Sequence, residues 1–154
     1  RVMWERGESA TRDARERNAP IAVLMIDVDN FKAINDRLGH TIGDQVLIAI
    51  ADTLARQIRS PEFLARVGGE EFMVLIPHGD ESAVRDIAER LRRVVERQEI
   101  APASSAALLC TVSVGYCISA QAQIEWQKLV GIADQALYAA KRGGRNRVTG
   151  TIVA

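Results

Sequence analysis

Cysteine, histidine and uncompensated charge are all scarce in this 154-residue chain. Its two cysteines, Cys110 and Cys117, are too few for a disulfide framework and lie in an apolar stretch, so we expect reduced core residues in a cytoplasmic domain. Twenty basic and twenty acidic side chains cancel to a formal charge of zero, which argues against sequence-independent binding to long nucleic acid. A single nucleotide remains compatible, because a few well-placed cations are enough to bind it.

Long apolar runs and leader-like segments are absent as well. The most obvious apolar run, residues 21–26, has the length of a strand and falls far short of the roughly 18 residues of a membrane helix. No signal-peptide pattern stands at the N-terminus. We therefore expect no membrane contact by this domain. Because the chain opens at Arg1 without an initiator methionine, we expect residues 1–154 to be a single domain cut from a longer protein.

Hydrophobic periodicity predicts alternating helices and strands. The run 21–26 shows no polar alternation, which is typical of a strand buried on both faces. Residues 111–119 alternate, which predicts a strand with only one covered face. The other expected elements are helices over residues 1–18, 44–58, 84–95 and 129–140, and strands over 63–67, 72–76 and 147–152. Together they predict an α/β (α+β) fold with one mixed sheet and helices packed on it.

The segment 66–72, Arg-Val-Gly-Gly-Glu-Glu-Phe, carries the densest signal. Gly68 and Gly69 separate two expected strands, and this pair permits positive φ at both centres of a tight hairpin turn. Glu70 and Glu71 follow at once. A metal–phosphate site needs both bare backbone and hard oxygen ligands, whereas a tight turn with two solvated acids is the plainer alternative.

Another acid, Asp27, stands at the exit of the buried strand. If the two strands are neighbours, Asp27 and Glu70 can meet. Two carboxylates and a backbone carbonyl make an incomplete oxygen shell, which Mg²⁺ completes with water and triphosphate oxygens. Positive charge for the phosphates is available from Lys32, Lys141 and Arg145. This set suits phosphoryl or nucleotidyl transfer.

Each of these residues also has an ordinary structural explanation. Asp27 and Asp29 could cap a helix that begins near Phe31, and Asp44 could be an N-cap after a turn at Gly43. The remaining polar residues could form a solvated helix face or complement a helix dipole: Lys32, Asn35, Asp36, Lys141 and Arg145.

Taken together, the motifs resemble the GGDEF domain family, the diguanylate cyclases, over essentially the whole chain. The matching blocks are residues 27–36, 39–40 with 43–44, 68–72, 113–115, and 133–141 with 144–147. The resemblance implies a ferredoxin-like palm of the class III nucleotide cyclase type, with a central mixed sheet flanked by helices. It implies condensation of two GTP into cyclic di-3′,5′-GMP with release of two pyrophosphates. It also implies a transient homodimer, in which each subunit holds one GTP, and an upstream sensory domain in the same protein.

The resemblance also implies roles for single residues. Asp27, Glu70 and the Val28 carbonyl correspond to ligands of Mg²⁺, for which Mn²⁺ is a possible substitute. Glu71 corresponds to a second acid, either a metal ligand or a proton acceptor. The expected nucleotide contacts are Asn35 and Asp44 for guanine, Leu47 beside the base, the backbone at Gly68 and Gly69, and Lys32, Lys141 and Arg145 for the phosphates.

Two departures from the family pattern stand out. The inhibitory product site usually reads Arg-x-x-Asp five residues before the signature, but here it reads Arg59 and Glu62, one methylene longer, with Arg90 as a secondary arginine. The usual opening segment, Asp-x-Leu-Thr-Gly-Leu-x-Asn-Arg, is not present, so we expect part of the base-side wall to be missing. The alternative function is a catalytically silent domain that senses GTP or cyclic di-GMP. Silent members usually lose a signature acid or glycine, and none is lost here.

Overall fold

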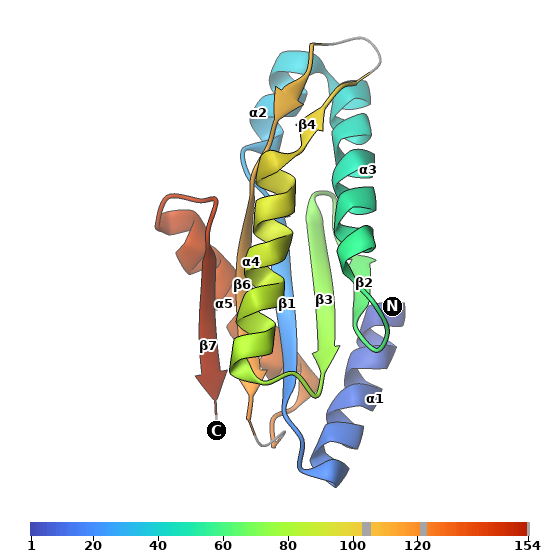
Figure 1. Ribbon diagram of the computed structural model, residues 1–154, viewed down its shortest axis with the longest axis vertical. Helices are drawn as coiled ribbons and strands as arrows, with labels where there is room; N and C mark the ends of the chain where they lie inside the picture. Colours follow the sequence, from blue (N-terminus) through green and yellow to red (C-terminus); the bar gives the residue numbers. More distant parts are fainter. Residues whose placement is uncertain (103–105, 121–122, 154) are drawn as a thin grey trace.

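The computed structural model describes residues 1–102, 106–120 and 123–153. Five strands form one sheet in the order β2-β3-β1-β6-β7, and every neighbouring pair is antiparallel except β6 and β7, which run parallel (Figure 1). The strands are β1 Ile21–Val28, β2 Phe63–Arg66, β3 Glu71–Pro77, β6 Val112–Ser119 and β7 Val148–Val153. The predicted mixed sheet is confirmed, with the apolar run at its centre.

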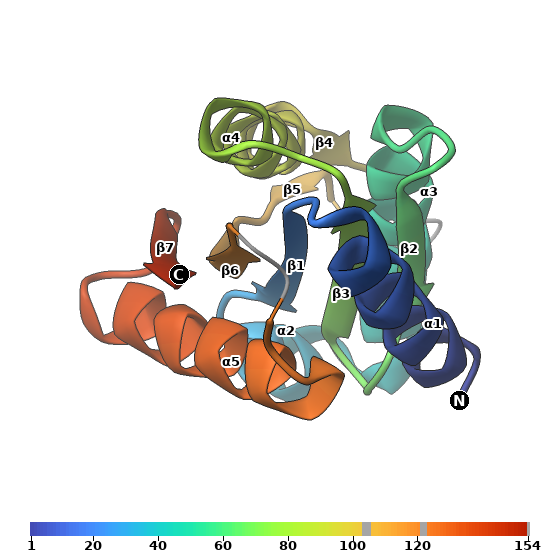
Figure 2. The same ribbon diagram turned by 90° about the horizontal axis from the view of Figure 1, so that it is seen from below.

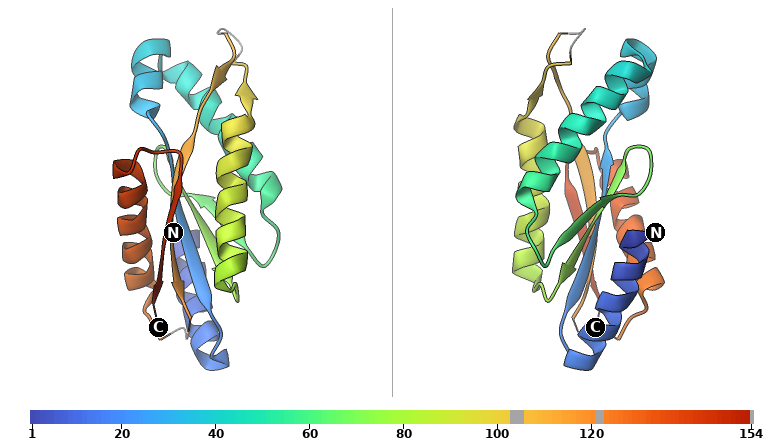
Figure 3. Two further views of the ribbon diagram at one scale, coloured as in Figure 1. Left: turned by 60° about the vertical axis from the view of Figure 1, so that its left-hand side comes forward. Right: turned by 90° about the vertical axis from the view of Figure 1, so that its right-hand side faces the viewer.

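Helices cover both faces of this sheet (Figures 2 and 3). The helices are α1 Val2–Arg17, α2 Phe31–Leu38, α3 His40–Gln57, α4 Glu81–Arg97 and α5 Trp126–Arg142, and β4 Glu99–Ile100 pairs with β5 Leu108–Leu109 in a separate small hairpin. Alternate residues of β1 enter two different cores. Leu24 and Ile26 pack with α2, α3 and α4, whereas Val23 and Met25 pack with α1 and α5. The strand is therefore buried on both faces, as the unbroken apolar run predicts.

The helices α1 and α5 meet through aromatic rings. Trp4 and Trp126 lie edge to face, with their ring centroids 5.9 Å apart. Gly7 makes this approach possible, because a Cβ at that position would lie only 2.1 Å from the Trp126 ring. None of the described helices has the length and apolarity of a bilayer-spanning segment.

The prediction that β6 has one open face is wrong, because all eight of its residues are buried. The face that carries Ser113, Gly115 and Cys117 packs against α5. A Cβ on Gly115 would lie 2.0 Å from the backbone nitrogen of Leu137, so the helix lies directly on the strand. The small residues Ser113 and Gly115, whose pattern resembles a solvent-exposed face in the sequence, allow the backbone of α5 to pack closely on the strand.

The boundary between α2 and α3 also differs from the prediction. The helix α3 begins at His40, four residues before the expected start, with Gly39 as its N-cap at φ 91°. Asp44 is therefore inside the helix and is not an N-cap. The N-cap of α2 is Asn30, so neither Asp27 nor Asp29 has the capping position.

Both cysteines are free and buried, as predicted. Burial raises the pKa of each thiol, that of Cys110 and that of Cys117, to about 11.

Candidate functional site

Two adjoining pockets, which share three lining residues, lie beside α2. We call the first the base pocket; it has a volume of about 580 Å³ and is lined by Phe31, Lys32, Asn35, Asp44, Leu47, Arg66, Gly69, Glu70 and Glu71. We call the second the phosphate pocket; it has a volume of about 490 Å³ and is lined by Asp27, Val28, Asn30, Phe31, Lys32, Ala33, Asp36, Glu70, Lys141 and Arg145. The two share Phe31, Lys32 and Glu70, so they adjoin at these three side chains.

A larger hollow of about 640 Å³ adjoins the phosphate pocket, with which it shares Asn30, Ala33 and Asp36. Its other lining residues include Asp29 and Leu109. It contains neither Glu70 nor Glu71. We therefore place the site in the base pocket and the phosphate pocket.

The acids of the phosphate pocket come from two paired strands. Asp27 of β1 lies opposite Glu71 of β3 in the sheet register, and the Val28 nitrogen donates a hydrogen bond of 3.2 Å to the Glu70 carbonyl. This pairing brings Asp27 and Glu70 into one pocket, as predicted. Among the residues that the structure describes, no three His, Cys, Asp or Glu side chains gather closely enough to hold a metal by themselves. A cation bound here needs further oxygen ligands, such as a carbonyl, water or phosphate.

The environment of the Asp27 side chain is unfavourable for its ionised form. Its Oδ1 atom is buried and has no hydrogen-bond partner, although the Lys141 Nζ atom lies 3.5 Å away as an ion pair. Burial raises the pKa of Asp27 to about 6; Lys141 opposes this rise, and Glu70 and Glu71 add to it. A buried oxygen of this kind is costly unless a donor or a cation satisfies it.

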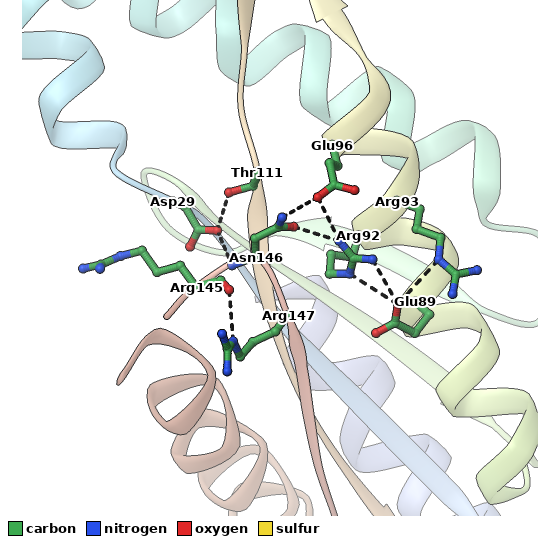
Figure 4. A network of polar contacts seen from close by, with 9 residues as sticks. All are labelled: Asp29, Glu89, Arg92, Arg93, Glu96, Thr111, Arg145, Asn146 and Arg147. Atoms are coloured by element: carbon green, nitrogen blue, oxygen red, sulfur yellow. Dashed lines mark hydrogen bonds and ion pairs between the residues drawn. The ribbon is translucent and has the colours of Figure 1, made fainter. Parts of the chain in front are cut away.

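Asp29, two residues later, accepts hydrogen bonds on both carboxylate oxygens, and Figure 4 shows those from Thr111 and Asn146. Its Oδ1 atom accepts hydrogen bonds from Ser113 Oγ at 2.7 Å and from Lys141 Nζ at 3.1 Å. Its Oδ2 atom accepts from Thr111 Oγ1 at 2.7 Å and from the Asn146 backbone nitrogen at 3.0 Å. Burial alone would raise the pKa of Asp29, but these hydrogen bonds outweigh it and hold that pKa below its usual value.

The base pocket depends on a close contact between α2 and α3. A Cβ on Gly43 would lie 1.8 Å from Asn35 Oδ1, so only glycine leaves room for this side chain. Asn35 Oδ1 is buried and has no hydrogen-bond partner. Because α3 begins at His40, Asp44 and Leu47 fall one turn apart on the pocket side. The pocket thus combines an apolar side chain, a carboxylate and an unpartnered amide oxygen.

The glycine turn is built differently from the prediction. Neither Gly68 nor Gly69 has a positive φ; the left-handed glycines among the described residues are Gly39 and Gly144. The turn is instead held by Arg66, whose Nε atom donates to the Gly68 carbonyl at 3.1 Å and to the Gly69 carbonyl at 3.0 Å. At Gly68, a Cβ would lie 2.9 Å from Glu71 Oε2, the end of a flexible side chain that can move aside.

The predicted inhibitory residues lie elsewhere. Arg90 of α4 donates from Nη2 to the Gln57 carbonyl at 3.0 Å, and the Glu62 nitrogen donates to the Arg59 carbonyl at 2.9 Å. All three therefore lie near the C-terminal end of α3. None of them lines the base pocket or the phosphate pocket.

Most of the predicted substrate and metal residues line one or both of the two pockets. They are Asp27, Val28, Lys32, Asn35, Asp44, Leu47, Gly69, Glu70, Glu71, Lys141 and Arg145, and Gly68 is the one outside both linings. The sequence patterns missed Arg66, Asp29 and Asn146. A basic residue two positions before the glycine pair could have indicated Arg66. Nothing in the spacing indicated the Asp29 contacts, because its partners are more than 80 positions away in the chain.

Comparison with known proteins finds diguanylate cyclases and GGDEF domains among the relatives of this chain. The family model described as "Diguanylate cyclase, GGDEF domain" matches residues 1–147. Diguanylate cyclase DosC of Escherichia coli K12 is 37% identical over 135 residues, which are 88% of this chain and 29% of DosC. The chain thus spans less than a third of this curated relative.

Solved structures agree in fold. The GGDEF domain of DgcB from Caulobacter crescentus, in complex with c-di-GMP, has a TM-score of 0.92 and 36% identity, covering 96% of this chain and 85% of that one. The active GGEEF domain of a diguanylate cyclase from Vibrio cholerae has a TM-score of 0.87 and 30% identity, covering 98% of this chain and 95% of that one.

Proposed function

Because this chain belongs to the GGDEF domain family, we propose that it is a diguanylate cyclase domain, which condenses two GTP into cyclic di-3′,5′-GMP and two pyrophosphates. The observation that carries the proposal is that the base pocket adjoins the phosphate pocket at Phe31, Lys32 and Glu70, as a site for one nucleotide requires. The names of the relatives support it, as does the c-di-GMP bound to the Caulobacter domain. The proposal includes an upstream sensory domain in the same protein.

The base pocket is suited to guanine. Guanine offers N1–H and N2–H₂ donors, which the Asp44 carboxylate can accept together, while the unpartnered Asn35 Oδ1 is a further acceptor. Adenine lacks the N1–H donor and would turn its N1 acceptor toward the carboxylate. A site built for a hydrogen bond rejects a ligand that leaves its own groups unpaired, so we expect GTP to bind in preference to ATP.

The phosphate pocket fits a hard divalent cation. Asp27, Glu70 and the Val28 carbonyl are the oxygen ligands that Mg²⁺ or Mn²⁺ would use. Asp27 Oδ1 has no hydrogen bond and only the Lys141 ion pair at 3.5 Å, so a bound cation would stabilise it. When bound, the cation supplies charge stabilisation at the attacking and leaving oxygens.

The remaining side chains act on the substrates directly. Lys32, Lys141 and Arg145 neutralise and orient the triphosphate. Each 3′-oxygen forms a bond to the α-phosphorus of the opposite GTP, the bond between the α-phosphorus and its bridging oxygen breaks, and pyrophosphate leaves. The hydroxyl proton passes to an acceptor, for which Glu71 is our candidate. Two chains face each other in a transient homodimer, so that each supplies one GTP.

The experiment is product formation by the purified domain from GTP, with and without Mg²⁺, followed by chromatography. We expect cyclic di-GMP only with the metal, and a loss of at least ~10²-fold in Glu70→Ala, by analogy with the removal of other groups that stabilise transition-state charge. Asp52→Asn, at an exposed acid of α3 outside both pockets, is the matched control and should retain activity. Full activity of Glu70→Ala would contradict the metal assignment. Wild-type binding of GTP or cyclic di-GMP without turnover would favour the silent sensor instead.

A further inference from the structure

The network around Asp29 adjoins the phosphate pocket, because Asp29 contacts Lys141 and lines the neighbouring larger hollow, although it does not line the phosphate pocket itself. We propose that Asp29 is a positioning residue, which fixes Lys141 and the Arg145–Asn146 turn where both cations can reach a triphosphate. This inference rests on the proposed function, since it concerns the same nucleotide.

The carboxylate of Asp29 is matched to its donors in a way that an amide cannot reproduce. Each oxygen accepts one hydroxyl hydrogen bond, from Ser113 or Thr111, and one bond from a group that can only donate. These obligate donors are the Lys141 ammonium on Oδ1 and the Asn146 backbone N–H on Oδ2. A hydroxyl can rotate to accept a bond, but an ammonium or a backbone N–H cannot. An asparagine here must therefore turn its NH₂ group toward one of the two obligate donors.

Lys141 lies between two carboxylates. Its Nζ atom is 3.1 Å from Asp29 Oδ1 and 3.5 Å from Asp27 Oδ1. Asp29 is almost fully buried, with 4% of its surface exposed, and is held by three further donors, so it gives the ammonium a fixed anchor. Without that anchor, Asp27 is the remaining anionic partner of Lys141. The lysine, which already lies 3.5 Å from Asp27 Oδ1, would then be held by that oxygen alone, the one that the proposed function reserves for the metal.

The turn that carries Arg145 is held from two sides. Arg145 and Asn146 both have left-handed backbones, with φ of 66° and 46°, a conformation that needs support in residues other than glycine. Asp29 holds the Asn146 nitrogen. On the other side, the Asn146 side chain accepts from Arg92 Nη1 at 2.8 Å and donates to Glu96.

This double hold determines where the Arg145 side chain points. Figure 4 shows it directed away from the network, and it lines the phosphate pocket. Loss of the Asp29 carboxylate would release one side of the turn, and with it the direction of Arg145.

The test measures nucleotide binding without turnover. Calorimetry with 3′-deoxy-GTP and Mg²⁺ is suitable, because this nucleotide lacks the attacking hydroxyl. We expect Asp29→Asn to weaken binding by about tenfold or more, on the scale of a lost charge-assisted hydrogen bond. Thr111→Val removes one neutral donor and keeps the carboxylate, so its loss should be smaller. The control Asp134→Asn, at an exposed acid of the helix that carries Lys141, should bind like the wild type.

A double-mutant cycle separates positioning from general destabilisation. If Asp29 acts through Lys141, the loss in Asp29→Asn with Lys141→Met will be smaller than the product of the two single losses. Thermal denaturation checks that every variant is folded, and Thr111→Val remains informative if Asp29→Asn does not fold.

The outcomes are distinguishable from those of the proposed function. A wild-type domain that binds no 3′-deoxy-GTP would overturn the proposed function and this inference together. Normal wild-type binding that persists in folded Asp29→Asn would overturn this inference alone. The same holds for a double mutant whose loss equals the product of the single losses, and for Thr111→Val binding like the wild type when Asp29→Asn is unfolded.

Discussion

Burial raises the pKa of Asp27 from 3.8 to about 6. Between these two pH values, the Asp27 carboxyl is protonated in the folded domain and ionised in the unfolded chain. Stability from this group is therefore fully present below about pH 3.8 and is lost as the pH rises through about 6. At neutral pH the ionised carboxylate is a net cost of folding. We expect Asp27→Asn to be inactive but more stable, by about 1–3 kcal/mol, as a shift of this size implies.

Urea denaturation at pH 7.5 in EDTA measures this difference. The advantage of Asp27→Asn should shrink below pH 6 and nearly vanish by pH 4, and adding Mg²⁺ should stabilise the wild type much more than the variant. A variant less stable than the wild type at pH 7.5 would contradict the assignment of Asp27 as a strained ligand.

Glu62 gives a second prediction at this scale. At the proposed inhibitory site, its carboxylate keeps the charge of the usual aspartate but has one more rotatable bond to fix on binding product. We expect Glu62→Asp to bind cyclic di-GMP more tightly, by roughly 1–2 kcal/mol, and Arg59→Ala to bind it more weakly. Calorimetric titration of product checks both. If Glu62→Asp binds no better than the wild type, the extra methylene is not what weakens this site.

Among the elements, the contact of α5 with β6 is the least tolerant of change. A methyl group on Gly115 would lie 2.0 Å from the Leu137 nitrogen and 2.5 Å from the Ala133 carbonyl oxygen, both of them backbone atoms that cannot rotate away. We expect Gly115→Ala to destabilise the domain by about 2–3 kcal/mol through overpacking. Gly131 lies in α5, and a Cβ there would have no atom within 4 Å, so Gly131→Ala should stabilise the domain by about 0.5–1 kcal/mol. Equal effects of the two substitutions in thermal denaturation would show that α5 does not lie as close to β6 as described.

The same contact shows what sequence patterns can and cannot predict about elements. Uniform apolar runs and helical spacing identified the central strand and the long helices, because their periodicity directly reflects burial. The covered second face of β6 was not predicted, because its small residues Ser113 and Gly115 resemble a solvent-exposed face in the sequence. Their small size instead allows α5 to pack closely on the strand. The start of α3 was placed too late, since its first turn follows a glycine cap and contributes only one apolar residue, Ile42, to the buried face.

The candidate site also contains contacts that the sequence predicted and contacts that it did not. Asp27, Glu70 and Lys141 lie in recognisable local motifs, so their meeting followed from the expected strand pairing. The contacts of Asp29 with Thr111 and Asn146 join three distant segments and depend on tertiary geometry alone. The turn of Gly68 and Gly69 was predicted with the wrong backbone, because Arg66 holds their carbonyls without any left-handed residue.

For the molecule as a whole, the proposed reaction needs two copies, because each chain supplies one GTP. Turnover of the domain alone then depends on an encounter of two loaded copies, which a tethering segment would make more frequent. We expect a largely monomeric, weakly active domain whose specific activity rises with protein concentration. Analytical ultracentrifugation together with activity over a dilution series checks this. A stable dimer with constant specific activity would contradict it.

The contact between Trp4 and Trp126 has an optical consequence. These are the only two tryptophans in the chain, they lie 5.9 Å apart where α1 meets α5, and neither lines the base pocket or the phosphate pocket. Trp126 is buried, whereas 40% of Trp4 is exposed. Intrinsic fluorescence of this protein therefore reports the docking of its N-terminal helix, and a change in emission on adding nucleotide would record movement of α1 against α5.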